Sequence, residues 1–162
     1  MSGAEILVIG LGNRLRGDDA AGPEVARLLR VRAPEIRAVE HEREPSDLIE
    51  LWADASLAIV VDAVQGEEPG RIHRVEVGRE ELRERRSAGA STHALALGEV
   101  IELARVLDRL PSHLVVFGIE GTRFDTGADL SPAARRAAVE AVELVLDELG
   151  EEGRAAPAQP AT

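Results

Sequence analysis

The sequence predicts an α/β fold: a three-layer sandwich in which a twisted, mostly parallel sheet of about five strands is flanked by helices. Short apolar runs rich in β-branched residues, typical of strands buried on both faces, alternate with segments whose apolar residues recur every three or four positions, as in helices. A chain of 162 residues is also long enough to bury a sizeable core. We expect residues 1–150 to form a single α/β domain, and residues 151–162, which have no apolar face, to form a disordered tail.

The first half of the chain contains three predicted strands and two predicted helices. The strands are the apolar runs at residues 5–10, 36–41 and 56–62. A first helix is expected near residues 23–32, because Pro23 suits the first turn of a helix and Pro34 ends it. A second helix is expected to begin at Pro45 and to extend through Trp52.

The second half contains two further predicted strands and a run of charges. Residues 71–77 alternate polar and apolar side chains, which predicts a strand at the edge of the sheet with one face in solvent. Residues 113–120 predict the last buried strand. We interpret the charge run REELRERR, residues 79–86, as a solvated turn of helix or a loop; a docking patch for a partner is the alternative.

Two longer helices are predicted beside these strands. Ser91 is expected to cap the first, and Ser131 with Pro132 is expected to begin the second, which Gly150 should end. The apolar residues expected to face inward are Leu97, Val100, Ile101, Ala104 and Leu107 in the first helix, and Val139, Val142, Leu146 and Leu149 in the second.

The composition excludes several classes of function. With 30 acidic and 19 basic residues, the net charge is −11, which argues against binding to nucleic acid or to an anionic membrane surface. The chain has no Cys, so thiol nucleophiles and disulfides are excluded, and any metal site must use oxygen and imidazole ligands. We find neither an apolar run long enough to span a bilayer nor a secretory signal, and we expect a cytoplasmic protein.

The loop after the first strand contains glycines at nucleotide-binding spacings but lacks the required residues. Gly10, Gly12 and Gly17 form GxGxxxxG rather than the dinucleotide-binding GxGxxG. A phosphate loop would need Lys and Ser or Thr after Gly17, where this chain has Asp18 and Asp19. Because two carboxylates repel a phosphate, the loop is predicted to bind a cation.

Three residues are candidates for a metal site. Asp19 follows the first strand, Asp62 ends the third, and His93 lies in the first turn of a helix, whose positive end favours the neutral, metal-binding imidazole. Each has an ordinary alternative: a helix cap for Asp19 or its neighbour Asp18, a loop polar residue for Asp62, and a surface histidine for His93. Together, two carboxylates and one imidazole from three strand-to-helix connections can meet on one edge of a parallel sheet, and three protein ligands with an open position are typical of catalytic metal sites.

Other polar residues have weaker claims. His41, His73 and His113 are weaker candidates, and we interpret His73 and His113 as structural or exposed. No Ser lies in a nucleophile elbow. Glu120, at the end of the last strand, is a candidate for supporting a ligand or acting as a base, and Asn13 for holding the first loop or contacting substrate.

Several of these segments together resemble the [NiFe]-hydrogenase maturation endopeptidases over residues 5–150. The resemblance rests on ILVIGLGNRLRGDDAAG, IVVDAV, STHALALGEVIELARVL, VVFGIE and LSPAARRAAVEAVELVLDEL. Two features depart from the family pattern: Ala20 stands where Gly is frequent, and residues 40–52 lack the Gly-rich, Thr-containing turn of many members. The second departure concerns a segment that could contact substrate, and it leaves the substrate subgroup open.

The resemblance implies an activity and a site. It implies a metal-dependent, aspartic-type endopeptidase that removes the C-terminal extension of a hydrogenase large-subunit precursor after nickel insertion. It also implies that the precursor supplies the nickel and that the nickel is contacted by Asp19, Asp62 and His93. By the same resemblance, no organic cofactor is needed and the protein is expected to be a monomer. Two alternatives remain: a metallohydrolase with its own metal and another peptide or amide substrate, and a non-catalytic nickel-handling protein, against which the lack of Cys and of a His-rich tract weighs.

Overall fold

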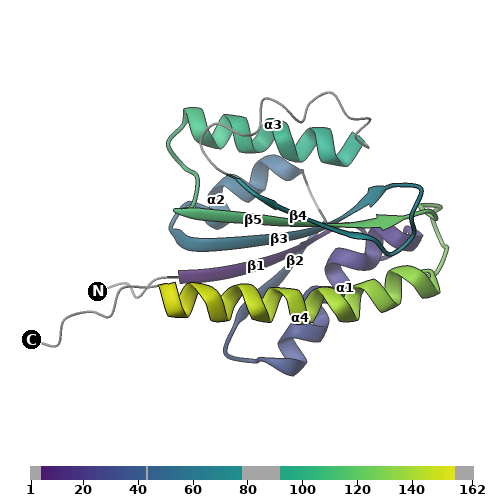
Figure 1. Ribbon diagram of the computed structural model, residues 1–162. Helices are drawn as coiled ribbons and strands as arrows, with labels where there is room; N and C mark the ends of the chain where they lie inside the picture. Colours follow the sequence, from purple (N-terminus) through teal and green to yellow (C-terminus); the bar gives the residue numbers. More distant parts are fainter. Residues whose placement is uncertain (1–4, 43, 78–91, 156–162) are drawn as a thin grey trace, which may run out of the picture.

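Five strands form one sheet in the order β2-β1-β3-β5-β4 over the part of the chain that the computed structural model describes, residues 5–42, 44–77 and 92–155 (Figure 1). Their bounds are β1 Glu5–Leu11, β2 Arg37–His41, β3 Ala55–Gln65, β4 Ile72–Glu76 and β5 His113–Gly121. The first three and β5 pair in parallel, and β4 runs antiparallel to β5 at the edge. The predicted fold class is therefore confirmed, together with the position of the last-but-one strand at the edge of the sheet; its antiparallel direction is a finding of the structure.

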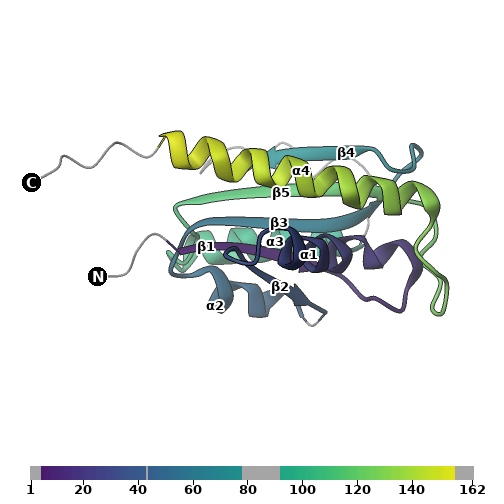
Figure 2. The ribbon, with the colours of Figure 1, turned by 90° about the horizontal axis from the view of Figure 1, so that it is seen from below.

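Helices cover both faces of the sheet. The helices are α1 Ala21–Arg32, α2 Leu48–Trp52, α3 Thr92–Val106 and α4 Pro132–Ala155, with short 3-10 helices η1 Gly17–Ala20 and η2 Pro45–Asp47. Figures 1 and 2 show α1 and α4 on one face and α2 and α3 on the other. None of the helices within the described residues is long and apolar enough to cross a membrane.

The core has one apolar cluster on each face of the sheet. On the α1 and α4 face, Phe117 of β5 is the largest buried side chain, and on the α2 and α3 face it is Trp52. The remaining buried residues are mainly Val, Ile, Leu and Ala. Because β1, β3 and β5 are buried on both faces, their sequences are continuously apolar, which is the pattern that predicts them.

Strand β3 is longer than predicted. Asp62 was expected to end this strand, but β3 continues to Gln65, and its register with β5 pairs Asp62 with Gly118. The expected end is therefore wrong, because the partner strand β5 supplies backbone hydrogen bonds for three more residues. Asp62 consequently lies inside the sheet near its carboxyl edge.

The helices differ from prediction at three residues. Leu107 lies beyond the end of α3 and is exposed, and Val139 is exposed on α4, so neither faces the core as expected. Helix α4 instead packs through small residues: Ala134, Ala137, Ala138 and Ala141 are buried. Gly150 does not end α4, which continues to Ala155; a Cβ at Gly150 would meet no atom within 4 Å, so no contact there forces the chain to turn.

The start of α4 is as predicted. The Ser131 hydroxyl oxygen accepts a hydrogen bond from the Ala134 backbone N–H at 3.2 Å, and Pro132 is the first helical residue. The predicted cap at Ser91, the charge run at 79–86 and the end of the chain from residue 156 lie outside the described residues. The side chains of 45, 92–96 and 151–155 lie outside them too.

Candidate active site

The carboxyl ends of β1 and β3 bring two of the three predicted ligands together. Asp19 lies in η1, directly after the loop that follows β1, and Asp62 lies near the end of the adjacent strand β3. Both are 2% exposed. Gly12 allows this arrangement, because its φ is +140° and a Cβ on it would lie 2.0 Å from the backbone oxygen of Asp19.

Asp18, the neighbour of Asp19, is a structural residue. Its Oδ2 accepts hydrogen bonds from the backbone N–H groups of Thr122 (2.9 Å) and Arg123 (3.1 Å), and its Oδ1 from that of Ser131 (2.8 Å). Burial alone would raise the pKa of Asp18, but these bonds outweigh it and hold the pKa below its ordinary value. Asp18 therefore connects η1 to the loop after β5 and to the start of α4.

Asp19 has fewer partners. Its Oδ2 accepts a hydrogen bond, at 2.8 Å, from the backbone N–H of Asn13. The Asn13 side chain in turn accepts a hydrogen bond from the backbone N–H of Leu15 at 2.8 Å. Asn13 thus holds the loop, which is one of its two predicted roles. Because no other described residue donates to this carboxylate, Asp19 retains acceptor capacity for a cation.

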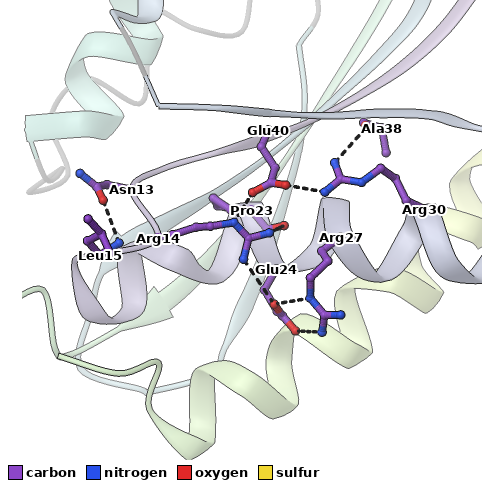
Figure 3. A network of polar contacts seen from close by, with 9 residues as sticks. All are labelled: Asn13, Arg14, Leu15, Pro23, Glu24, Arg27, Arg30, Ala38 and Glu40. Atoms are coloured by element: carbon purple, nitrogen blue, oxygen red, sulfur yellow. Dashed lines mark hydrogen bonds and ion pairs between the residues drawn. The ribbon is translucent and has the colours of Figure 1, made fainter. Parts of the chain in front are cut away.

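A network of ion pairs holds the same loop from outside (Figure 3). The Arg14 guanidinium contacts Glu40 of β2, which is also paired with Arg30 of α1. Arg14 also lies 4.0 Å from Glu24, whose carboxylate pairs with Arg27 at 2.5 and 3.0 Å. The loop after β1 is thereby tied to β2 and to α1.

Asp62 is a buried carboxylate near the end of β3. Neither of its oxygens has a hydrogen bond within the described part of the chain. Burial and the charge of nearby Asp19 raise the pKa of Asp62 to about 8. A buried, unpaired carboxylate beside a second one destabilises a protein unless a proton or a cation compensates the charge. A proton or a cation between these two carboxylates would therefore stabilise the folded protein.

The third predicted ligand is only partly described. Val61 and Ala63 face α1 and α4, so the alternation of β3 places Asp62 on the opposite face, which α2 and α3 cover. Figure 1 shows that α3 runs opposite to β3 and β5, so that its first turn lies toward their carboxyl ends. His93 is the second residue of α3, and its side chain lies outside the described residues. Among the residues that are described, no group of three His, Cys, Asp or Glu could hold a metal ion.

Glu120 and His73 form a pair that the sequence did not predict. The Nε2 atom of His73, on β4, lies 3.3 Å from the Oε2 atom of Glu120, on β5. From the sequence, Glu120 is a candidate for supporting a ligand or acting as a base, whereas His73 is interpreted as structural or exposed. Their pairing depends on the antiparallel register of β4 with β5, which no local pattern reveals. Elsewhere, His113 is exposed at the start of β5, and His41 contacts the backbone oxygen of Glu44 at 3.3 Å.

The fold and the carboxylate pair define a class: an α/β protein with two buried aspartates at the carboxyl edge of its sheet. The family profile HycI, described as hydrogenase maturation protease, matches residues 32–148. The chain therefore belongs to the hydrogenase maturation protease family.

Individual relatives agree with this assignment. The chain is 30% identical over 157 residues to the hydrogenase expression/formation protein HupD of Thiocapsa roseopersicina, covering 94% of this chain and 71% of the relative. It is 31% identical over 153 residues to HupD of Bradyrhizobium diazoefficiens, and this match covers 91% of this chain and 79% of the relative.

Solved structures share the fold. The hydrogenase maturating endopeptidase HybD from E. coli is similar with a TM-score of 0.78 and 25% identity, covering 92% of this chain and 94% of that one. The [NiFe] hydrogenase maturation protease HybD from Thermococcus kodakarensis has a TM-score of 0.74 at 24% identity, and the match covers 89% of this chain and 98% of that chain. The second likeness, at lower identity, supports the fold alone.

Proposed function

We propose that this protein is an endopeptidase that removes the C-terminal extension of a nickel-loaded [NiFe]-hydrogenase large-subunit precursor. Membership of the hydrogenase maturation protease family supports the reaction class. The observation that carries the finer proposal is Asp62, a buried carboxylate with no hydrogen bond in the described residues, beside the carboxylate of Asp19. In this proposal Asp19, Asp62 and His93 contact nickel that arrives with the substrate.

The carboxylate pair suits a checkpoint. Two carboxylates with one raised pKa hold a proton until a cation replaces it, so the site is complete only when the precursor carries its metal. Binding through the metal would then place the scissile peptide at the sheet edge by proximity. Nickel so bound would also polarise a nearby carbonyl or a water molecule.

The test is cleavage of a purified precursor, followed by intact-mass spectrometry. The precursor is supplied with and without nickel, and the enzyme as wild type, Asp19→Asn, Asp62→Asn or His93→Ala. We expect loss of a C-terminal peptide only with nickel and only with wild type. Asp54→Asn is the matched control, because Asp54 is exposed just before β3, at the opposite edge of the sheet from Asp62. This variant should cleave the precursor as wild type does.

Three outcomes would contradict parts of the proposal. Equal cleavage of the nickel-free precursor would show that cleavage does not depend on nickel, while leaving the protein a protease of the precursor. Nickel binding without cleavage of any cognate precursor would favour a nickel-handling protein. Stoichiometric metal in the purified protein, together with cleavage of unrelated peptides, would favour a metallohydrolase with its own metal.

A further inference from the structure

The proposed cleavage needs a group that moves protons, and the sheet places one beside Asp62. The parallel register of β3 with β5 pairs Asp62 with Gly118, and the antiparallel register of β4 with β5 pairs Gly118 with His73. Because paired residues of neighbouring strands point to the same side, Asp62 and His73 rise from the same face of the sheet. This is also the face that the first turn of α3 approaches (Figure 1).

Gly118 lies between these two residues and has no side chain. Among the described residues, a Cβ built on it would meet only the Val64 side chain, at 3.5 Å. Two inter-strand spacings separate Asp62 from His73, which puts their Cα atoms about 10 Å apart. A cation bound at Asp62 and a peptide group next to it fit within that span.

Glu120 lies against the imidazole of His73. The Glu120 Oε2 atom is buried and has no hydrogen bond in the described residues, and it lies 3.3 Å from His73 Nε2. The other oxygen packs against the turn after β3, where a Cβ on Gly66 would lie 1.8 Å from Oε1. The Glu120 side chain is 12% exposed, whereas that of His73 is 44% exposed. A buried carboxylate therefore lies against Nε2 of the imidazole, which leaves the other ring nitrogen, Nδ1, free of this contact.

We propose that His73 is the acid–base residue of the cleavage and that Glu120 is its positioning residue; this rests on the function proposed above. His73 Nδ1 takes a proton from a water molecule as the water oxygen bonds to the scissile carbonyl carbon. The same nitrogen then returns the proton to the amide nitrogen, which receives the electron pair of the breaking C–N bond. The products are a new carboxylic acid on the large subunit, which releases its proton to solvent, and a free amine on the released peptide; His73 ends neutral as it began.

The test separates chemistry from binding. Single-turnover cleavage of nickel-loaded precursor is measured by intact mass, and precursor affinity is measured separately, for His73→Ala and Glu120→Gln. We expect His73→Ala to slow cleavage about 100-fold or more, which is the usual contribution of a general acid–base group, with precursor Kd unchanged. Added imidazole should restore part of the rate for His73→Ala. Glu120→Gln, which keeps the shape but removes the charge, should slow cleavage about 10-fold without loss of affinity.

His113→Ala is the matched control. His113 is exposed at the start of β5, away from the carboxyl edge, and its variant should cleave at the wild-type rate. A His73→Ala rate within about threefold of wild type, or a loss confined to precursor affinity, would overturn the assignment of His73. If wild-type protein itself cleaves no nickel-loaded precursor, the proposed function fails instead.

Discussion

Asp18 and Asp19 are adjacent in the sequence, but their carboxylates have different environments. Asp18 accepts three backbone hydrogen bonds from residues more than 100 positions later in the chain, whereas Asp19 accepts one from Asn13 in its own loop. The sequence could predict an acidic pair after the first strand. It could not separate the structural member from the metal-binding candidate, because that difference depends on where the loop after β5 packs.

Substitution of Asp18 should therefore lower stability, whereas substitution of Asp19 should affect nickel binding. Asp18→Ala removes the acceptor for three buried backbone N–H groups, and we expect it to lower the free energy of unfolding by about 3 kcal/mol. Asp19→Asn keeps an acceptor for Asn13 and removes a charge next to Asp62, so stability should be maintained while nickel binding is lost. Urea unfolding and nickel titration measure the two effects. Greater destabilisation by Asp19→Asn than by Asp18→Ala would reverse the two roles.

At the scale of elements, the loop after β1 is fixed by charges on β2 and α1. Arg14→Met removes the contacts with Glu40 and Glu24, which are partly exposed and should contribute less than about 1 kcal/mol to global stability. We nevertheless expect faster hydrogen exchange at Asn13 and weaker nickel binding, because the loop positions Asp19. Arg27→Met is the control: Arg27 also pairs with Glu24, but its pair lies within α1. Equal exchange in both variants would show that Arg14 does not order the loop.

The edge strand β4 is held to α4 by one bidentate ion pair. Arg74 donates to Glu148 at 2.9 and 2.6 Å, and the Glu148 side chain is 10% exposed. Glu148→Gln should lower the free energy of unfolding by about 1–3 kcal/mol, because it removes the charge from a bidentate pair whose carboxylate is buried, although Arg74 keeps a longer contact with Glu76 at 3.5 Å. Glu143→Gln is the matched control on the same helix, since its pair with Arg32 is exposed on both sides and should contribute almost nothing. Denaturant unfolding would contradict this if the two variants lost equal stability.

At the scale of the whole molecule, local patterns predict the strands and helices, while their register determines the site. The apolar run ending near Asp62 correctly indicates a central strand, and Ser131-Pro132 correctly indicates the start of α4. The extension of β3 to Gln65 and the pairing of His73 with Glu120 both follow from pairing with β5. Contacts between strands distant in sequence leave no signal in either strand alone, so a single sequence could not predict them.

The stability of the whole domain should depend on the protonation of Asp62. Its pKa is raised to about 8 by burial and by Asp19, above the ordinary value of 3.8, so between these pH values the folded protein retains a proton that the unfolded chain releases. The free energy of unfolding therefore contains a contribution that is present below pH 4 and is lost as the pH rises toward 8. Asp62→Asn removes this dependence, and we expect it to be more stable than wild type at pH 8 by about 2–5 kcal/mol.

The comparison needs urea unfolding of both proteins from pH 5 to pH 8, with Asp54→Asn as an exposed control that should follow wild type. Nickel should then restore stability to wild type at pH 8 and leave Asp62→Asn unchanged, because a bound cation replaces the lost proton only where the carboxylate is present. Parallel pH profiles for wild type and Asp62→Asn would show that the buried carboxylate is compensated by another group. In that case Asp62 would carry no uncompensated charge for a cation to neutralise.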